Sequence, residues 1–266
     1  MDCLFCRADA EKSRSVEHII PESLGNTKHV LNRGIVCDKC NNYFSRKVEK
    51  PFLDLPAIRY LRFHEGLESK RGRVPSVNGV LSPQIPVEVT RHMRRGFTSV
   101  QIPDDAIQEV RQMRSGTLLI STGSRLPEGP IVSRFFAKIA LEAMALRVSS
   151  YPEGLAYLSA EPQLDTLRNH ARLGHIESWP VNVRSIYGPD SKVTSHEGNP
   201  EQVMHEHDFL VTDQQEWYFV IAIFGVEFVI NLAGPYIDGY LQWLEQNGGV
   251  SPLYRPKHGG ILAMPR

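Results

Sequence analysis

The sequence predicts an α+β protein with a small N-terminal module followed by a larger α+β domain. Three observations support this prediction. All four cysteines lie within the first 40 of the 266 residues, in two Cys-x-x-Cys pairs. Strand-like segments follow in the middle of the chain, and an amphipathic helical pattern begins after Pro130. We expect the module at residues 1–56, a basic linker and the start of a sheet at 57–130, and the α+β domain at 131–266.

The two cysteine pairs have the spacing of a structural zinc site. A two-residue gap lets both thiolates of a pair reach one tetrahedral ion. Disulfides are the alternative, but the first cysteine lies too near the start to follow a signal peptide, and a reducing cytosol keeps thiols free. A thioredoxin-like redox pair needs a βαβ context that neither pair has. We therefore predict a cytoplasmic protein with one zinc ion bound by Cys3, Cys6, Cys37 and Cys40.

The first 55 or so residues are too few to build a core unaided, so their folding should depend on the metal. Residues 16–20 are rich in β-branched side chains and predict an extended segment. Residues 41–50 contain no Gly or Pro and predict a short helix that Pro51 and Pro56 stop or redirect. This assignment places Asn41 in the first helical turn.

The remaining elements follow from apolar spacing and turn residues. Strands are expected near residues 87–90, 97–102 and 117–121. Apolar residues recur at helical spacing from Val132 to Leu146 and predict a helix with one core-facing stripe. Residues 217–223 and 226–232 predict a hairpin joined near Gly225, and Pro235 introduces a helix over 236–246. These patterns indicate an α+β domain without indicating its purpose.

The charge distribution is asymmetric although the formal net charge is zero. Residues 1–100 carry 17 Lys and Arg against 11 Asp and Glu, whereas residues 101–266 carry 13 against 19. A positive N-terminal part suits a partner with a phosphate backbone, although an ordinary solvated surface would give a similar excess. The longest apolar run, residues 217–232, is interrupted by Gly225, Glu227 and Asn231, so we expect no membrane span.

Three polar residues near the cysteines have the chemistry that phosphodiester hydrolysis needs. The imidazole of His18 has the chemistry to take a proton from water. The carboxylate of Glu17 and the amide oxygen of Asn41 suit a hard divalent ion such as Mg²⁺. If residues 16–20 are extended, however, Glu17 and His18 point to opposite faces unless the strand twists or ends there.

The order of these residues resembles that of a known family. The segments Ser15 to Asn26 (SVEHIIPESLGN) and Ile35 to Glu49 (IVCDKCNNYFSRKVE) look like the two signature blocks of the HNH endonucleases, the ββα-metal group, and most closely its zinc-containing, endonuclease VII-like type. The resemblance covers residues 3–50. It implies a ββα-metal, treble-clef-type module in which the four cysteines hold a structural zinc remote from the chemistry.

The resemblance also implies roles for individual residues. His18 matches the general base, Glu17 the acidic metal ligand and Asn41 the metal ligand on the helix, where many members have His. Asn32 matches an asparagine that braces the backbone. In the implied reaction, His18 activates a water while Mg²⁺ or Mn²⁺ contacts the scissile phosphate and the leaving 3′ oxygen. The products would be 5′-phosphate and 3′-hydroxyl ends.

DNA is the implied substrate, and restriction or antiphage defence is the role suggested by analogy. Arg46 and Lys47 would contact its backbone, or else form a solvated helix face. The basic cluster at residues 91–95 is equally a DNA-contact loop or an exposed turn.

The alternative for the whole protein is a non-catalytic zinc-finger DNA-binding or adaptor protein. A homodimer, or a partner or activator bound by the C-terminal domain, also stays open.

Overall fold

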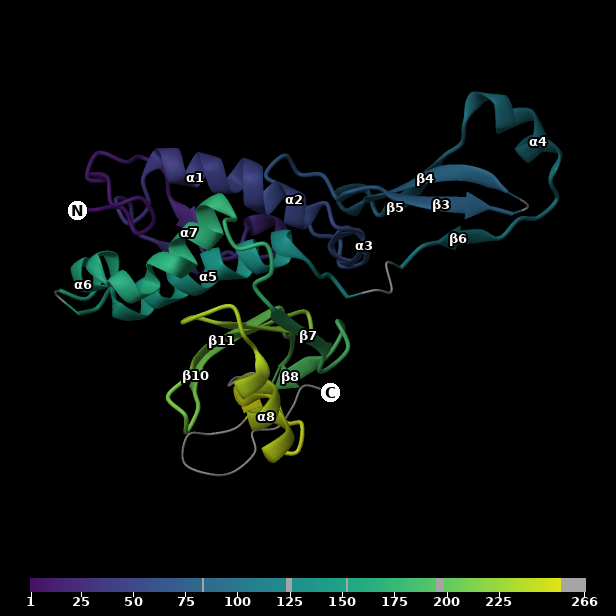
Figure 1. Cartoon of the computed structure of the whole chain (residues 1–266). Helices are drawn as coiled ribbons and strands as arrows, with labels where there is room; N and C mark the ends of the chain where they lie inside the picture. Colours follow the sequence, from purple (N-terminus) through teal and green to yellow (C-terminus); the bar gives the residue numbers. More distant parts are fainter. Residues whose placement is uncertain (83, 123–125, 152, 195–198, 255–266) are drawn as a thin grey trace. The chain divides into compact units, whose positions relative to one another are not determined.

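The computed structural model describes residues 1–82, 84–122, 126–151, 153–194 and 199–254 (Figure 1). The chain forms two compact units, each assembled from separate segments. The first contains residues 1–19, 28–49 and 128–266, and the second contains residues 20–27 and 50–127. This division differs from the three consecutive segments expected from the sequence. Its physical reason is that the short N-terminal module shares the core of the C-terminal region instead of building its own.

The N-terminal module consists of a short hairpin and a helical segment. Strand β1 (Glu17–His18) pairs antiparallel with β2 (Val30–Leu31). Helix α1 (Asp38–Phe44) begins three residues earlier than predicted and continues through a π-helical segment, η2 (Ser45–Glu49), into α2 (Lys50–Leu53). Pro51 therefore lies inside α2 and does not end the helix. The wide turn of η2 immediately precedes this proline, which lacks an N–H and whose ring clashes with a regular α turn.

Helix α5 (Pro130–Val148) is the central helix of the first unit. The sequence predicted one apolar stripe, but the helix is buried on most of its circumference, including Lys138 and Glu142. Its neighbours are β2, η2, strand β12, α6 (Gly154–Ala160) and α7 (Asp165–Leu173). A helix covered on several sides retains no polar face. Among the described residues, no helix is both long and apolar enough to cross a bilayer.

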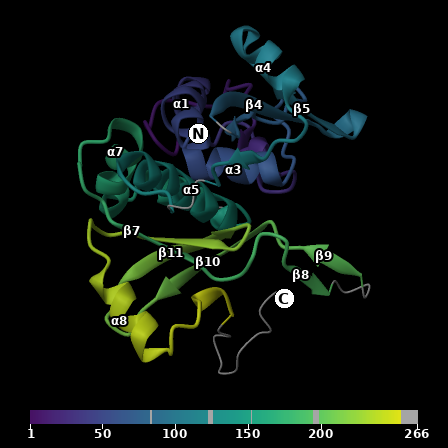
Figure 2. The same cartoon turned by 90° about the vertical axis from the view of Figure 1, so that its right-hand side faces the viewer.

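An antiparallel sheet packs against α5 in the first unit. It contains β7 (Val181–Ser185), β10 (His205–Val211), β11 (Trp217–Ile223) and β12 (Val226–Asn231), in the order β10-β11-β12-β7. The ring of Phe136 on α5 stacks on Phe228 of β12 at 4.2 Å. Helix α8 (Asp238–Gln246) covers the other face through Tyr240. Figure 2 shows the sheet between these two helices.

The predicted hairpin near Gly225 is confirmed. Strands β11 and β12 are joined by Phe224 and Gly225, whose φ angles of 47° and 78° are typical of the two-residue type I′ turn. A Cβ at position 225 would lie 2.2 Å from the Tyr187 carbonyl oxygen, so glycine is required there for space as well as conformation. A small separate sheet pairs β8 (Lys192–Thr194) with β9 (Pro200–Gln202).

The second unit contains a four-stranded antiparallel sheet and, besides α2, two further α-helices among its described residues. The strands are β3 (Val77–Leu81), β4 (Ile85–His92), β5 (Phe97–Gln101) and β6 (Leu118–Ile120), in the order β5-β4-β3-β6. The helices are α3 (Pro56–His64) and α4 (Ile107–Gln112). The predicted strands correspond to β4, β5 and β6, whereas β3 was not predicted.

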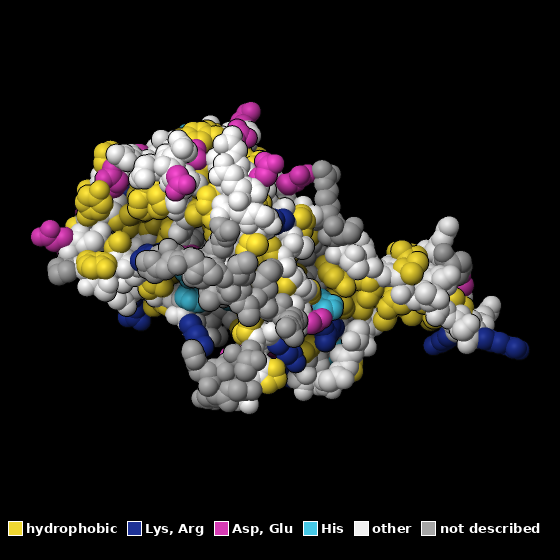
Figure 3. Space-filling view, turned by 90° about the horizontal axis from the view of Figure 1, so that it is seen from below, with side chains coloured by type: hydrophobic (Ala, Val, Ile, Leu, Met, Phe, Trp, Pro, Cys, Tyr) yellow, Lys and Arg dark blue, Asp and Glu magenta, His cyan; other side chains and the backbone are white. Residues whose placement is uncertain are grey.

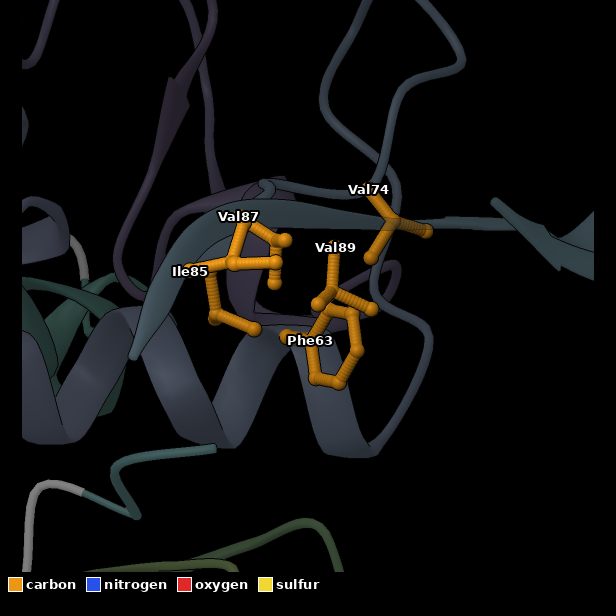
Figure 4. Packing of buried hydrophobic residues seen from close by; sticks show 6 residues of the cluster. Phe63, Val74, Ile85, Val87 and Val89 are labelled. Atoms are coloured by element: carbon orange, nitrogen blue, oxygen red, sulfur yellow. The ribbon is translucent and has the colours of Figure 1, made fainter. Parts of the chain in front are cut away.

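Alternating side chains explain how this sheet forms its core. Ile85, Val87 and Val89 on β4 face inward and pack with Val74 and with Phe63 of α3 (Figure 4). Other hydrophobic side chains of the unit remain exposed, and yellow atoms gather on the right-hand part of Figure 3. The exposed hydrophobic residues of β3, β5 and β6 are Val80, Phe97, Val100 and Leu119.

Candidate functional site

The four cysteines converge on one point. Their sulfur atoms all lie within 4.8 Å of one another, and the Sγ atoms of Cys6 and Cys37 are 3.6 Å apart. Four thiolates bound to zinc at about 2.3 Å would be separated by about 3.8 Å, so the arrangement fits a tetrahedral zinc. Backbone N–H groups of Cys37 and Cys40 donate to Cys3 Sγ and Cys37 Sγ at 3.3 and 3.4 Å. A side-chain hydrogen bond with Cys40 and the backbone bonds lower the pKa of Cys3 to about 4, which favours its thiolate.

Arginine side chains fix the zinc loop to the C-terminal part of the first unit. Arg168 of α7 is buried and its Nε donates to the Leu4 carbonyl at 3.0 Å. Arg7 pairs with Asp165 at 2.6 Å, and its Nε donates to the Ser159 carbonyl at 2.9 Å. The first cysteine pair is therefore held from outside the module as well as by the metal. Sequence reasoning did not identify these arginines.

Glu17 lies in a buried cluster of charges around Lys138 of α5. The Lys138 ammonium is fully buried and lies 2.7 Å from Glu17 Oε1, 2.8 Å from Glu49 Oε1 and 2.8 Å from Glu142 Oε2. Glu17 itself is only 6% exposed. The predicted metal ligand therefore neutralises a lysine that sequence reasoning did not select. One signal for it was present, because Lys138 and Glu142 are opposite charges one helical turn apart within an apolar pattern.

The cluster holds three carboxylates against one ammonium, and its protonation reflects this imbalance. Burial acts to lower the pKa of Lys138, but the carboxylates of Glu142, Glu17 and Glu49 raise it well above its ordinary value. Burial raises the pKa of Glu142 well above the usual range of a carboxyl group. The carboxylates around it thus keep Lys138 charged at neutral pH, and burial favours the neutral form of Glu142.

His18 lies beside Glu17 in β1 and pairs with Val30 in the ladder. Neighbouring side chains of a regular strand point to opposite faces, and β1 consists of these two residues. His18 is partly buried, and its Nδ1 atom is buried. The difficulty raised by the sequence therefore remains, because Glu17 contacts the buried Lys138.

Asn41 connects the helix to the strand. It is the fourth residue of α1, and its Nδ2 donates to the Val16 carbonyl at 3.3 Å, immediately before Glu17. With its amide nitrogen bonded to the backbone, its oxygen is the atom suited to a cation. Asn32 is exposed in the turn after β2, where its carbonyl accepts from Ile35 N at 3.4 Å. The remaining predicted residues, on η2, are both exposed: Arg46 and Lys47.

Comparison with known proteins finds one match. Residues 3–55 match the family model described as HNH endonuclease, a segment that contains both cysteine pairs, β1, β2 and α1. This segment is therefore similar to the HNH endonucleases. No curated protein and no solved structure matches the chain. The HNH module indicates a nuclease with DNA as its substrate and implies a divalent metal, in addition to the zinc for which the cysteines are placed.

Proposed function

We propose that this protein is a metal-dependent endonuclease that hydrolyses DNA phosphodiester bonds with His18 as the general base. The observation that carries the proposal is the hydrogen bond from Asn41 to Val16, which ties the helix of the HNH module to the strand of Glu17 and His18. Three residues of family-matched type thus belong to one locally braced structure. His18 is only partly buried, and a base for hydrolysis needs access to water.

The divalent ion of this proposal is Mg²⁺ or Mn²⁺, held by Glu17 and Asn41. A carboxylate and an amide oxygen are hard donors, which fits such an ion. When bound, the ion would offset the charge of the phosphate and of the leaving 3′ oxygen. Arg46 and Lys47 on the exposed side of η2 would neutralise neighbouring phosphates, and Asn32 would brace the turn between β2 and α1.

Lys138 has a positioning role in the same proposal. Its ammonium fixes one oxygen of Glu17 at 2.7 Å, which restricts the rotation of that carboxylate. His18 then accepts the proton of the attacking water, and bulk water removes it after the reaction. An outer partner that fixes a metal ligand reduces the rearrangement of that ligand that the reaction would otherwise require.

The second candidate function is a non-catalytic zinc-finger protein that binds DNA or serves as an adaptor. The observation that favours it is the same ion pair, because a buried ammonium already neutralises Glu17 and competes with a divalent ion for its charge. This candidate predicts DNA binding without strand cleavage in any metal.

The test is cleavage of supercoiled plasmid by the full chain after its zinc content is measured. Incubation with Mg²⁺ or Mn²⁺ should give nicked or linear DNA, and EDTA added in excess over these ions should stop the reaction. The nicks should be sealed by DNA ligase without prior phosphorylation, as 5′-phosphate and 3′-hydroxyl ends require. Binding without cleavage in either metal would instead support the zinc-finger candidate.

A role in restriction or antiphage defence would appear as fewer phage plaques on cells expressing the active protein.

A further inference from the structure

The second unit has a basic hollow that the HNH module does not explain. It has a volume of about 550 Å³ and lies at the turn between β4 and β5, where η3 (Met93–Arg95) connects the strands. Four arginines line it, against one glutamate, Glu68. The second unit as a whole has 12 Lys and Arg against 8 Asp and Glu, although the chain is neutral. The lining arginines are Arg73, Arg91, Arg94 and Arg95.

One of these arginines is fixed and the others face solvent. Arg91 donates through Nη1 to the carbonyls of Phe63, at 3.1 Å, and His64, which are the last residues of α3. It therefore caps the helix and shapes the hollow. Arg73, Arg94 and Arg95 are exposed, and Arg94 pairs with Glu68 at 3.3 Å. An exposed ion pair of this kind is weak, so Arg94 can exchange its partner for a phosphate.

An aromatic pair lies next to these arginines. His92, which lines the hollow, pairs across the ladder with Phe97, and their rings stack at 4.5 Å with an interplanar angle of 25°. A 2.9 Å contact between His92 Nε2 and Ser99 Oγ fixes the imidazole. Phe97 remains 47% exposed. A fixed ring with an open face beside several arginines is the combination that stacks an unpaired base while phosphates are neutralised.

We propose that this hollow and Phe97 bind single-stranded DNA, with phosphates on Arg73, Arg94 and Arg95 and a base on Phe97. The inference rests on the proposed DNA endonuclease function and specifies its substrate as DNA that contains an unpaired stretch. Paired bases present no free face to Phe97, so duplex DNA gains only the phosphate contacts. The surface also gives a role to the basic cluster at residues 91–95.

The test measures binding of a fluorescent 20-nucleotide oligothymidine to the zinc-loaded full chain. Binding is monitored by fluorescence anisotropy in excess Mg²⁺. Every protein variant also carries His18→Ala, which prevents cleavage of the DNA. Phe97→Ala should weaken binding at least about fivefold, the lower end for loss of one stacked base, while leaving duplex binding unchanged. Arg94→Ala with Arg95→Ala should weaken both and reduce the salt slope for the oligonucleotide by about 1.4. The matched control is Arg111→Ala with Arg114→Ala, exposed positions of the same unit outside the hollow, which should leave binding unchanged.

Two results would overturn the inference. Binding that is unchanged in both the Phe97 and the Arg94–Arg95 variants would place the DNA elsewhere. The second result is that the Arg94–Arg95 variant loses oligonucleotide binding, Phe97→Ala does not, and heparin competes as well as DNA does. It would show that the hollow attracts any polyanion and does not contact a base. The nuclease proposal is judged separately, because plasmid cleavage by the wild-type chain does not depend on these results and binding does not depend on cleavage.

Discussion

Zinc removal is expected to unfold the N-terminal module and to destabilise the whole first unit. Apparent zinc binding free energies for small structural sites are about 10–16 kcal/mol, and most of that stabilisation is unavailable to the metal-free chain. The module cannot compensate, because its hairpin has only two residues in each strand and its helix shares the core of α5. Unfolding should therefore propagate to α5, whose Lys138 pairs with Glu17, and to α7, whose Arg168 holds the zinc loop at Leu4.

This prediction is checked by hydrogen exchange with zinc bound, after chelation and after zinc is restored. Chelation should abolish protection in residues 1–19 and 28–49 and reduce it in α5, and added zinc should recover both. The second unit is the internal control, since its sheet has its own core and should keep its protection. Cys37→Ser should reproduce the chelated state. Full protection of residues 1–19 and 28–49 in a zinc-free sample would contradict a structural role for the metal.

Replacing Lys138 by methionine is expected to cost about 3–5 kcal/mol of folding free energy, the range for breaking a buried ion pair by removing one partner. The ammonium is the common partner of Glu17, Glu49 and Glu142 at 2.7 to 2.8 Å, so its loss leaves several buried carboxyl groups uncompensated. Methionine keeps most of the side-chain volume, which limits any packing contribution. The measurement is urea unfolding of the zinc-loaded protein at pH 7.

Glu142→Gln is the matched control. Burial raises the pKa of Glu142 and so favours its neutral form, and the amide is a neutral group of the same shape. Its cost should be well below that of Lys138→Met. Equal destabilisation by the two variants would mean that Glu142 is ionised, and a cost below about 1 kcal/mol for Lys138→Met would mean that the charge cluster is not a stabilising feature.

Local signals predicted much of this fold because they depend on few residues. Cysteine spacing predicted the zinc site, and turn chemistry at Gly225 predicted the hairpin, since each is determined within a short segment. The module helix was predicted to start at residue 41 and to be stopped or redirected by Pro51 and Pro56; it starts at Asp38, and a π turn precedes Pro51, which lies inside α2. Strand β3 was missed because Gly79 and Asn78 weaken its pattern, and pairing with β4 and β6 compensates.

The environment of the predicted site depends on long-range contacts that sequence patterns do not contain. Glu17 and His18 were selected from local chemistry, but the partner of Glu17 lies 121 positions later, on α5. Long-range contacts also explain why residues 1–19 and 28–49 form one unit with residues 128–266, because the two N-terminal segments do not form a core alone. Charged residues within an apolar helical pattern, such as Lys138 and Glu142, are the one signal from which this contact could have been suspected.

The most direct test of the central claim is plasmid cleavage by His18→Ala compared with wild type and with His175→Ala. His175 is exposed and lies outside the HNH module, so its variant controls for the loss of an imidazole. With zinc content and folding equal in all three, the account predicts a loss of about 10²- to 10⁴-fold in the metal-dependent rate for His18→Ala, the usual contribution of a general base, and no loss for His175→Ala. Equal cleavage by His18→Ala and wild type would contradict the assignment of His18 as the base.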